Sequence, residues 1–155
     1  MKSAYSVTIM ALINSTTAQR IADEIFSSYN GKIISISIID AKGGGENFLA
    51  TKSTESFEKT FGVLQEGRKY GGTLAIAALG IANEVREVAG ETKAVTTTYE
   101  RCKMTLIPIP SYEILVGFVL ERRAILDEDR VASHIENLVS DNANATTTTT
   151  TNPPK

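Results

Sequence analysis

Few residues of this chain have the types and spacing that enzyme chemistry requires. The 155 residues include one histidine, His134, and one cysteine, Cys102. A histidine that acts as a general base or a metal ligand usually needs a second partner group, and no pattern in the sequence brings the two residues together. We therefore interpret His134 as a surface or rim residue of the last helix. Cys102 is interpreted as a small, partly buried residue at a strand end.

The three glycines Gly43, Gly44 and Gly45 are the next candidate, because glycine-rich loops can cradle phosphates. A phosphate-binding loop also needs Lys followed by Ser or Thr, and a helix directly after the loop. Here the residues that follow have the pattern of a strand. The glycines therefore favour a hairpin connection, in which they supply positive φ angles.

Charged clusters complete the search for chemistry. Arg122 and Arg123 could act in trans as an arginine finger on a GTPase, but two solvated arginines at a strand end are the simpler interpretation. Glu121 and Asp127–Asp129 lack the spacing and the glycine of an EF-hand loop. The acidic run favours the positive N-terminal end of the last helix. We predict no catalytic residue, no metal and no cofactor, and so a protein that is not an enzyme.

The hydrophobic periodicity predicts the elements that must position any site. They follow the order α-β-β-α-β-β-β-α, which is typical of the α+β class with a single antiparallel five-stranded sheet and flanking helices. This order contains no parallel βαβ core of the nucleotide-binding kind. A further short helix is expected over 54–66. The eight main elements span about 15–31, 32–40, 47–52, 73–89, 93–99, 103–110, 113–121 and 127–140.

Three of these elements indicate how the domain could meet a partner. The helix over 73–89 carries an apolar stripe, and its many Ala and Gly residues would let another backbone approach closely. The Thr-rich strand over 93–99 is weakly apolar and has the pattern of an edge strand, where a second chain can add. The strand over 113–121 is apolar on both faces, which predicts a central position.

Composition and charge limit the partners. The formal net charge is −2 with both signs interspersed, so we expect no nucleic-acid binding. No segment approaches the ~20 apolar residues that cross a bilayer, so we expect no membrane insertion and a cytoplasmic protein. We predict an N-terminal extension over 1–14, one domain over 15–140 and a disordered Thr-rich tail over 141–155.

The residue pattern over 73–139 resembles the Roadblock/LC7 family of dynein-light-chain-type domains, whose layers are profilin-like. The resemblance is carried by LAIAALGIANEVREVAG, by KAVTTTYERCKMTLIPIP, by YEILVGFVLERRA and by the final helix. Residues 15–53 match the first helix and hairpin of the family more loosely. The family often has a glycine-containing turn before the last helix, where this chain has AILDEDR.

The resemblance implies a non-catalytic dimeric adaptor or regulator that binds a Ras-like small GTPase, as a GTPase-activating partner or as a scaffold. Family members dimerise through the third strand and the second helix, with themselves or with a paralogue. Carried onto this chain, the dimer interface consists of Lys93, Val95, Thr96, Thr97 and Thr98 on the strand, and Leu74, Ala78, Ile81 and Val85 on the helix.

A second hypothesis is a sensor that binds a small molecule or a peptide. Antiparallel sheets with flanking helices, including PAS-like and profilin-like folds, also hold ligands between helix and sheet. The sensor hypothesis predicts a cavity and a bound ligand, whereas the adaptor hypothesis predicts a stable dimer.

Overall fold

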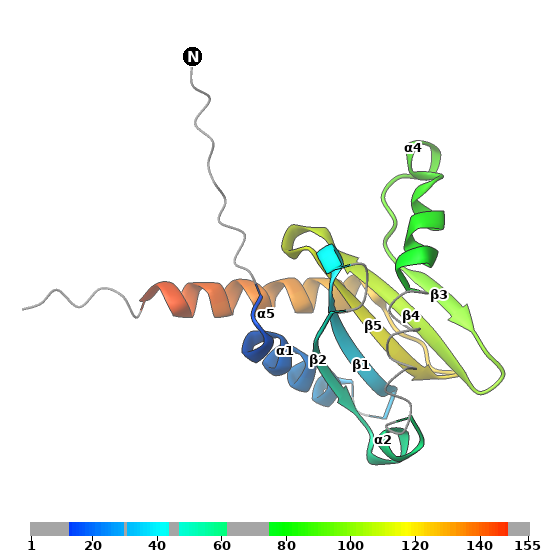
Figure 1. Cartoon of the computed structure of the whole chain (residues 1–155), viewed down its shortest axis with the longest axis horizontal. Helices are drawn as coiled ribbons and strands as arrows, with labels where there is room; N and C mark the ends of the chain where they lie inside the picture. The colour runs from blue at the N-terminus through cyan, green and yellow to red at the C-terminus, as the bar shows by residue number, and fades with distance from the viewer. Residues whose placement is uncertain (1–12, 30, 44–46, 62–74, 149–155) are drawn as a thin grey trace, which may run out of the picture.

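A computed structural model describes residues 13–29, 31–43, 47–61 and 75–148 of the chain, and it contains one five-stranded antiparallel sheet in the order β2-β1-β5-β4-β3 (Figure 1). The strands are β1 (Ile33–Asp40), β2 (Phe48–Ser53), β3 (Val95–Thr98), β4 (Cys102–Ile109) and β5 (Ile114–Glu121). The helices are α1 (Ser15–Ser28), α2 (Glu55–Phe61), α4 (Arg86–Ala89) and α5 (Glu128–Thr148), and residues 75–83 are also helical. The predicted fold class is confirmed.

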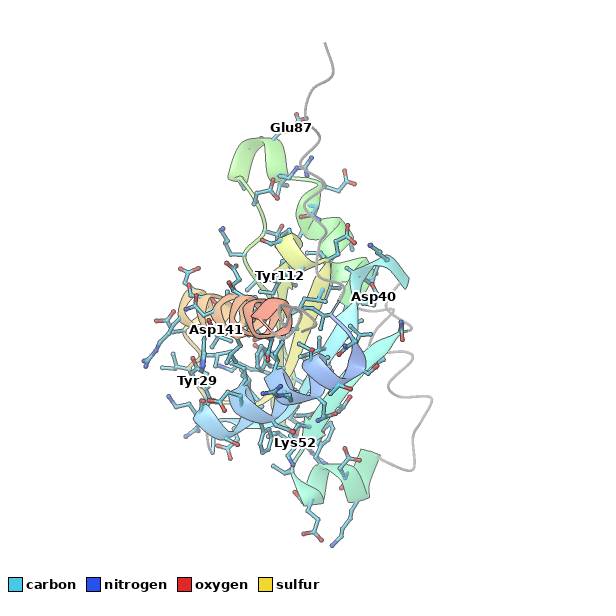
Figure 2. The ribbon with its side chains drawn as sticks, turned by 90° about the vertical axis from the view of Figure 1, so that its left-hand side faces the viewer. Tyr29, Asp40, Lys52, Glu87, Tyr112 and Asp141 are labelled. Atoms are coloured by element: carbon cyan, nitrogen blue, oxygen red, sulfur yellow. The ribbon has the colours of Figure 1, made fainter. Side chains whose placement is uncertain are left out.

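The main core lies between one face of the sheet and the helices α1 and α5, which Figure 2 shows side by side on the same side of the sheet. Helical spacing places the apolar residues of each helix on one stripe, and that stripe is buried. The largest fully buried side chains of this core include Ile21 and Ile25 of α1, Ile135 of α5 and Phe118 of β5. These side chains fix α1 and α5 on the sheet.

A smaller apolar cluster lies on the opposite face of the sheet. Its buried members are Ile39, Leu106 and Leu115, and Ala75, Ile76 and Leu79 of the helical segment 75–83 pack against them. Strand β5 thus contributes buried side chains to both faces, with Phe118 on one and Leu115 on the other. The prediction of a central strand over 113–121 is confirmed.

The packed part of the chain begins slightly earlier than residue 15, where the sequence placed the start of the domain. Ile13 packs against the main core, and Asn14 is the N-cap of α1. The Asn14 side-chain oxygen accepts a hydrogen bond from the backbone N–H of Thr17 at 2.8 Å. Asparagine is among the preferred N-cap residues because its short side chain reaches this N–H. Residues 1–12 of the predicted extension lie outside the described residues.

The prediction of one continuous helix over 73–89 is wrong, because the described part of this segment is interrupted by a turn. Residues 75–83 are helical, 84–85 form a turn, and α4 begins at Arg86. Asn83 precedes the turn, and its side-chain oxygen accepts a hydrogen bond from the Thr92 hydroxyl at 2.8 Å. Asparagine disfavours helix interiors because its side chain competes for such local bonds. Residues 83–91 are all exposed, so no buried stripe favours one continuous helix over a break before α4.

The last helix extends further than predicted. α5 continues to Thr148, so residues 141–148 are helical and not disordered as expected. The Asn142 side chain donates a hydrogen bond to the Leu138 carbonyl, 2.9 Å away. Extending a helix that has already formed orders one residue for each hydrogen bond gained, which costs far less than starting one. Residues 149–155 lie outside the described residues. Among the described helices, none is long and apolar enough to cross a bilayer.

Candidate interaction surface

The helical segment 75–83 has apolar residues on two sides, and only one side is used within the subunit. Ala75, Ile76 and Leu79 face the sheet. Ile81 lies on another side and leaves 74% of its surface exposed. An exposed isoleucine gains none of the roughly 1.5–3 kcal/mol that burial of such a side chain provides. The segment therefore presents an apolar surface without a covering element among the described residues.

This apolar surface continues into α4. Val85 is 57% exposed and Val88 is 95% exposed. Figures 1 and 2 show why, because the segment 75–83 and α4 project beyond one end of the sheet, with Glu87 at the far tip. The Arg86 guanidinium and the Glu91 carboxylate, 4.0 Å apart, close the loop at this tip. We call the residues 75–89 the projecting arm.

Strand β3 lies at the sheet edge next to the projecting arm, and its backbone orientation follows from its register. The Tyr99 N–H donates to the Cys102 carbonyl at 2.8 Å. Hydrogen-bonded and non-hydrogen-bonded pairs alternate along an antiparallel ladder. Since Thr96 pairs with Thr105 and Thr98 with Lys103, these two β3 residues occupy non-hydrogen-bonded positions. Their N–H and C=O groups point away from β4, toward the open edge.

Among the described residues, no strand or side chain bonds to these outward backbone groups of Thr96 and Thr98. An edge with unpaired N–H and C=O groups is a template for another strand. The side chains of Thr96, Thr97 and Thr98 are exposed, so they do not cover the edge. The prediction that this segment forms an edge strand is confirmed.

The other edge of the sheet is partly closed. Helix α1 packs along β2, and the Gln19 side chain donates a hydrogen bond to the Thr51 carbonyl at 3.3 Å. The Thr54 N–H bonds to the Ile34 carbonyl, so alternation along β2 makes Thr51 one of its outward-facing residues. The two edges therefore differ. β2 has a helix beside it, whereas β3 has an exposed apolar arm.

Most of the predicted interface residues lie on the projecting arm, on β3 or directly before β3. Ala78, Ile81 and Val85 lie on the projecting arm, and Ala78 is partly buried. Lys93 is exposed and precedes β3, while Val95 is partly buried in the small cluster with Leu79. Strand and arm thus pack against the same small cluster. Leu74 lies outside the described residues. Sequence reasoning missed Val88 as an interface candidate, although it belonged to the same apolar stripe.

The candidate chemical residues do not converge. Cys102 is partly buried at the start of β4, as predicted. His134 lies on α5, where its ring centroid is 6.2 Å from that of Tyr29. Among the described residues, no group of three or more His, Cys, Asp or Glu side chains could hold a metal ion. Among the described residues, the side chains of Cys102 and His134 form no hydrogen bond with a candidate catalytic partner.

Two further interpretations from the sequence are supported. The glycine-rich segment after β1 connects antiparallel strands β1 and β2, as the hairpin interpretation requires. Gly44 and Gly45 lie outside the described residues. Asp127 accepts a hydrogen bond from the Arg130 N–H at 3.1 Å, so it caps the first turn of α5. Arg122 is exposed at the end of β5 and donates to the Glu100 carbonyl at 3.4 Å.

No protein-family model and no curated protein sequence matches the chain. Solved structures do match. A Roadblock/LC7 domain from Streptomyces avermitilis is 9% identical with a TM-score of 0.55, and the alignment covers 79% of this chain and 92% of that one. The gliding protein MglB from Thermus thermophilus is 14% identical with a TM-score of 0.58, covering 82% and 91%. A structure of MglB with a tetrameric arrangement is 16% identical, also with a TM-score of 0.58, covering 79% and 87%. The chain therefore has the Roadblock/LC7 fold.

Proposed function

We propose that this chain, a Roadblock/LC7 fold, is a non-catalytic adaptor that dimerises through β3 and the projecting arm and binds a Ras-like small GTPase. The observation that carries the dimer is the combination of the open β3 edge with the exposed side chains of Ile81 and Val85. Hydrogen bonds between two edge strands fix the register of their pairing, and burial of apolar side chains beside them provides free energy of association.

A twofold axis beside β3 satisfies both features at once. Two antiparallel β3 strands would pair the outward groups of Thr96 and Thr98 with the same groups of a second copy. The projecting arms would then lie close to the axis, where Ile81 of each subunit can be covered. A solved neighbour of the same fold, MglB, has a tetrameric arrangement, which is consistent with self-association on this fold. A paralogue with the same edge could replace the second copy.

The GTPase is supported by the sequence resemblance and the shared fold, and not by a site in this chain. A sheet that is continuous across two subunits provides a broad, rigid platform with helices on both faces. Such a platform can bind a GTPase in one nucleotide state, because the switch segments of a GTPase change their order with the bound phosphate. Acceleration of hydrolysis does not require a residue from this chain, since a platform can also act by ordering those segments.

Two measurements test the proposal separately. Analytical ultracentrifugation of the purified chain over a concentration series measures the dimer. A pull-down from source lysate, in parallel with GDP and with a non-hydrolysable GTP analogue, identifies the partner. We expect a dimer at micromolar concentration and one small GTPase enriched in one nucleotide state. If the chain is still a monomer at about 100 µM, which is on the order of the dissociation constant of a weak specific interface, the proposed dimer is contradicted. A dimer that captures no GTPase in either state contradicts the partner.

A further inference from the structure

A groove lined mainly by polar residue types, on the far side of the sheet from the projecting arm, has no role in the proposed function. It lies between the C-terminal end of α1 and the first turns of α5 and has a volume of ≈ 810 Å³. Small-molecule sites span roughly 300–1,000 Å³, and this groove falls in that range while being open to solvent on one side. It is lined by Ser28, Tyr29, Lys32, Arg130, Ser133, His134 and Asn137.

The lining residues of α5 share one side of the helix by their spacing. Arg130, Ser133, His134 and Asn137 occupy positions i, i+3, i+4 and i+7, which places them on one face of the helix. The alternate row of the same helix, with Val131 and Ile135, is fully buried in the main core. Packing of that apolar row therefore fixes the direction in which the polar row faces.

The other wall of the groove comes from the end of α1 and the turn that follows it. The Lys32 N–H donates to the Tyr29 carbonyl at 3.1 Å, which closes this turn. The turn brings Lys32 to the same groove as Arg130, although the two residues are far apart in sequence. Tyr29 contacts His134 across the groove with a tilt of 52° between the rings. Figure 2 shows Tyr29 on the α1 side of the molecule, remote from Glu87 of the projecting arm.

The chemistry of the lining points to an anion. Lys32 and Arg130 contribute two positive charges on exposed side chains, and among the described residues no Asp or Glu lines the groove. Neither cation forms an ion pair with another described residue. Ser28, Ser133 and Asn137 add neutral hydrogen-bond donors. An arginine fork beside a lysine and hydroxyl groups suits the three terminal oxygens of a phosphate monoester.

We propose that this groove binds a small phosphorylated molecule with an aromatic or other flat apolar part. The phosphate lies between Arg130 and Lys32, and the flat part lies against the rings of Tyr29 and His134. The groove and the projecting arm lie on opposite faces of the sheet, so ligand binding does not require the proposed dimer and is not blocked by it.

The test is a titration of the ¹⁵N-labelled full chain with phenyl phosphate, followed by ¹H–¹⁵N NMR spectra. We expect saturable shifts of the amides of Tyr29, Arg130 and His134. Arg130→Gln and Lys32→Gln should each weaken binding about tenfold, which corresponds to ~1.4 kcal/mol. Lys59→Gln is the matched control, because Lys59 is an exposed lysine of α2 outside the groove, and it should leave the affinity unchanged. Arg130→Lys should recover part of the loss.

A second pair of measurements separates phosphate binding from general attraction to cations. Tyr29→Leu should abolish the preference for phenyl phosphate over inorganic phosphate while phosphate itself still binds. Absence of saturation with phenyl phosphate, or equal weakening by Lys59→Gln and Arg130→Gln, overturns the proposal. A phosphoserine peptide that saturates these amides where phenyl phosphate does not also overturns it, and assigns the groove to a protein partner.

Discussion

Thr96 and Thr105 lie opposite each other on β3 and β4, and their hydroxyl oxygens are 3.0 Å apart. The hydroxyl of Thr96 is therefore used within the subunit, whereas its backbone N–H points to the open edge of the sheet. The two groups of Thr96 can therefore be tested separately, because one substitution removes the outward N–H and another removes the hydroxyl bond to Thr105.

Thr96→Pro should weaken the proposed dimer. Proline has no N–H, so each subunit loses one outward donor, while the hydrogen bonds between β3 and β4 remain. We expect the dimer dissociation constant to rise about tenfold or more, since each lost bond is worth ~1 kcal/mol. Sedimentation velocity at several concentrations measures the change.

Two control variants show whether the effect comes from the outward N–H of Thr96. Thr96→Val keeps the N–H and removes the hydroxyl, so it should leave the dimer intact. Thr97→Pro removes an N–H that points toward β4, so it should lower the free energy of unfolding of the subunit by about 1–3 kcal/mol. If Thr96→Pro stays folded and dimerises as tightly as Thr96→Val, the edge assignment is wrong.

Ile81→Ser should dissociate the dimer without destabilising the subunit. Ile81 is 74% exposed in the isolated subunit, so its removal opens no cavity there. If the side chain is buried between two subunits, each loses roughly 1.5–3 kcal/mol, and the dissociation constant rises about 100-fold or more.

Ile125→Ser is the matched control for Ile81→Ser. Ile125 is 82% exposed in the loop before α5 and belongs neither to β3 nor to the projecting arm. It should leave the sedimentation profile unchanged. Equal effects of the two substitutions would mean that the arm is not the apolar part of the interface.

Gly80→Ala should stabilise the subunit. A Cβ at Gly80 meets no atom within 4 Å, and alanine in an exposed helix interior is favoured over glycine by roughly 0.5–1 kcal/mol. Gly90→Ala should have the opposite sign, because Gly90 has a φ of 85°, which costs a residue with a Cβ about 1 kcal/mol. Thermal unfolding of both variants, followed by circular dichroism, measures the two shifts. A lower Tm for Gly80→Ala would show that a neighbour occupies the space beside it.

Asn14→Ala should lower the free energy of unfolding by ~1 kcal/mol, because it removes the acceptor for the Thr17 N–H at the start of α1. Ser15→Ala changes the first residue of the helix, where no side-chain cap hydrogen bond is lost, and it should have little effect. Urea unfolding of the two variants at one pH compares them directly, and a larger loss for Ser15→Ala would contradict the cap at Asn14.

The strands and their order were predictable because their signals are local. Alternation of isoleucine and serine in β1 and the two-sided apolar pattern of β5 each have one simple explanation in a sheet. The turn at 84–85 was not predictable, since it contains neither Gly nor Pro and lies beside a side-chain bond between Asn83 and Thr92, nine residues apart. The polar row on α5 was visible in the sequence, but its partner Lys32 reaches it only through the packing of α1 against α5.

The difference between the two sheet edges limits the size of any assembly. A pairing of β3 with β3 about a twofold axis consumes both open edges, so the two subunits form a closed unit. Continued growth into a fibre would require β2, where Gln19 already occupies the outward carbonyl of Thr51 and the register shifts between Ile38 and Ile39. In the proposed dimer, the helix beside β2 would thus hinder growth of the sheet from edge to edge, and the β3 edge would be used by one partner.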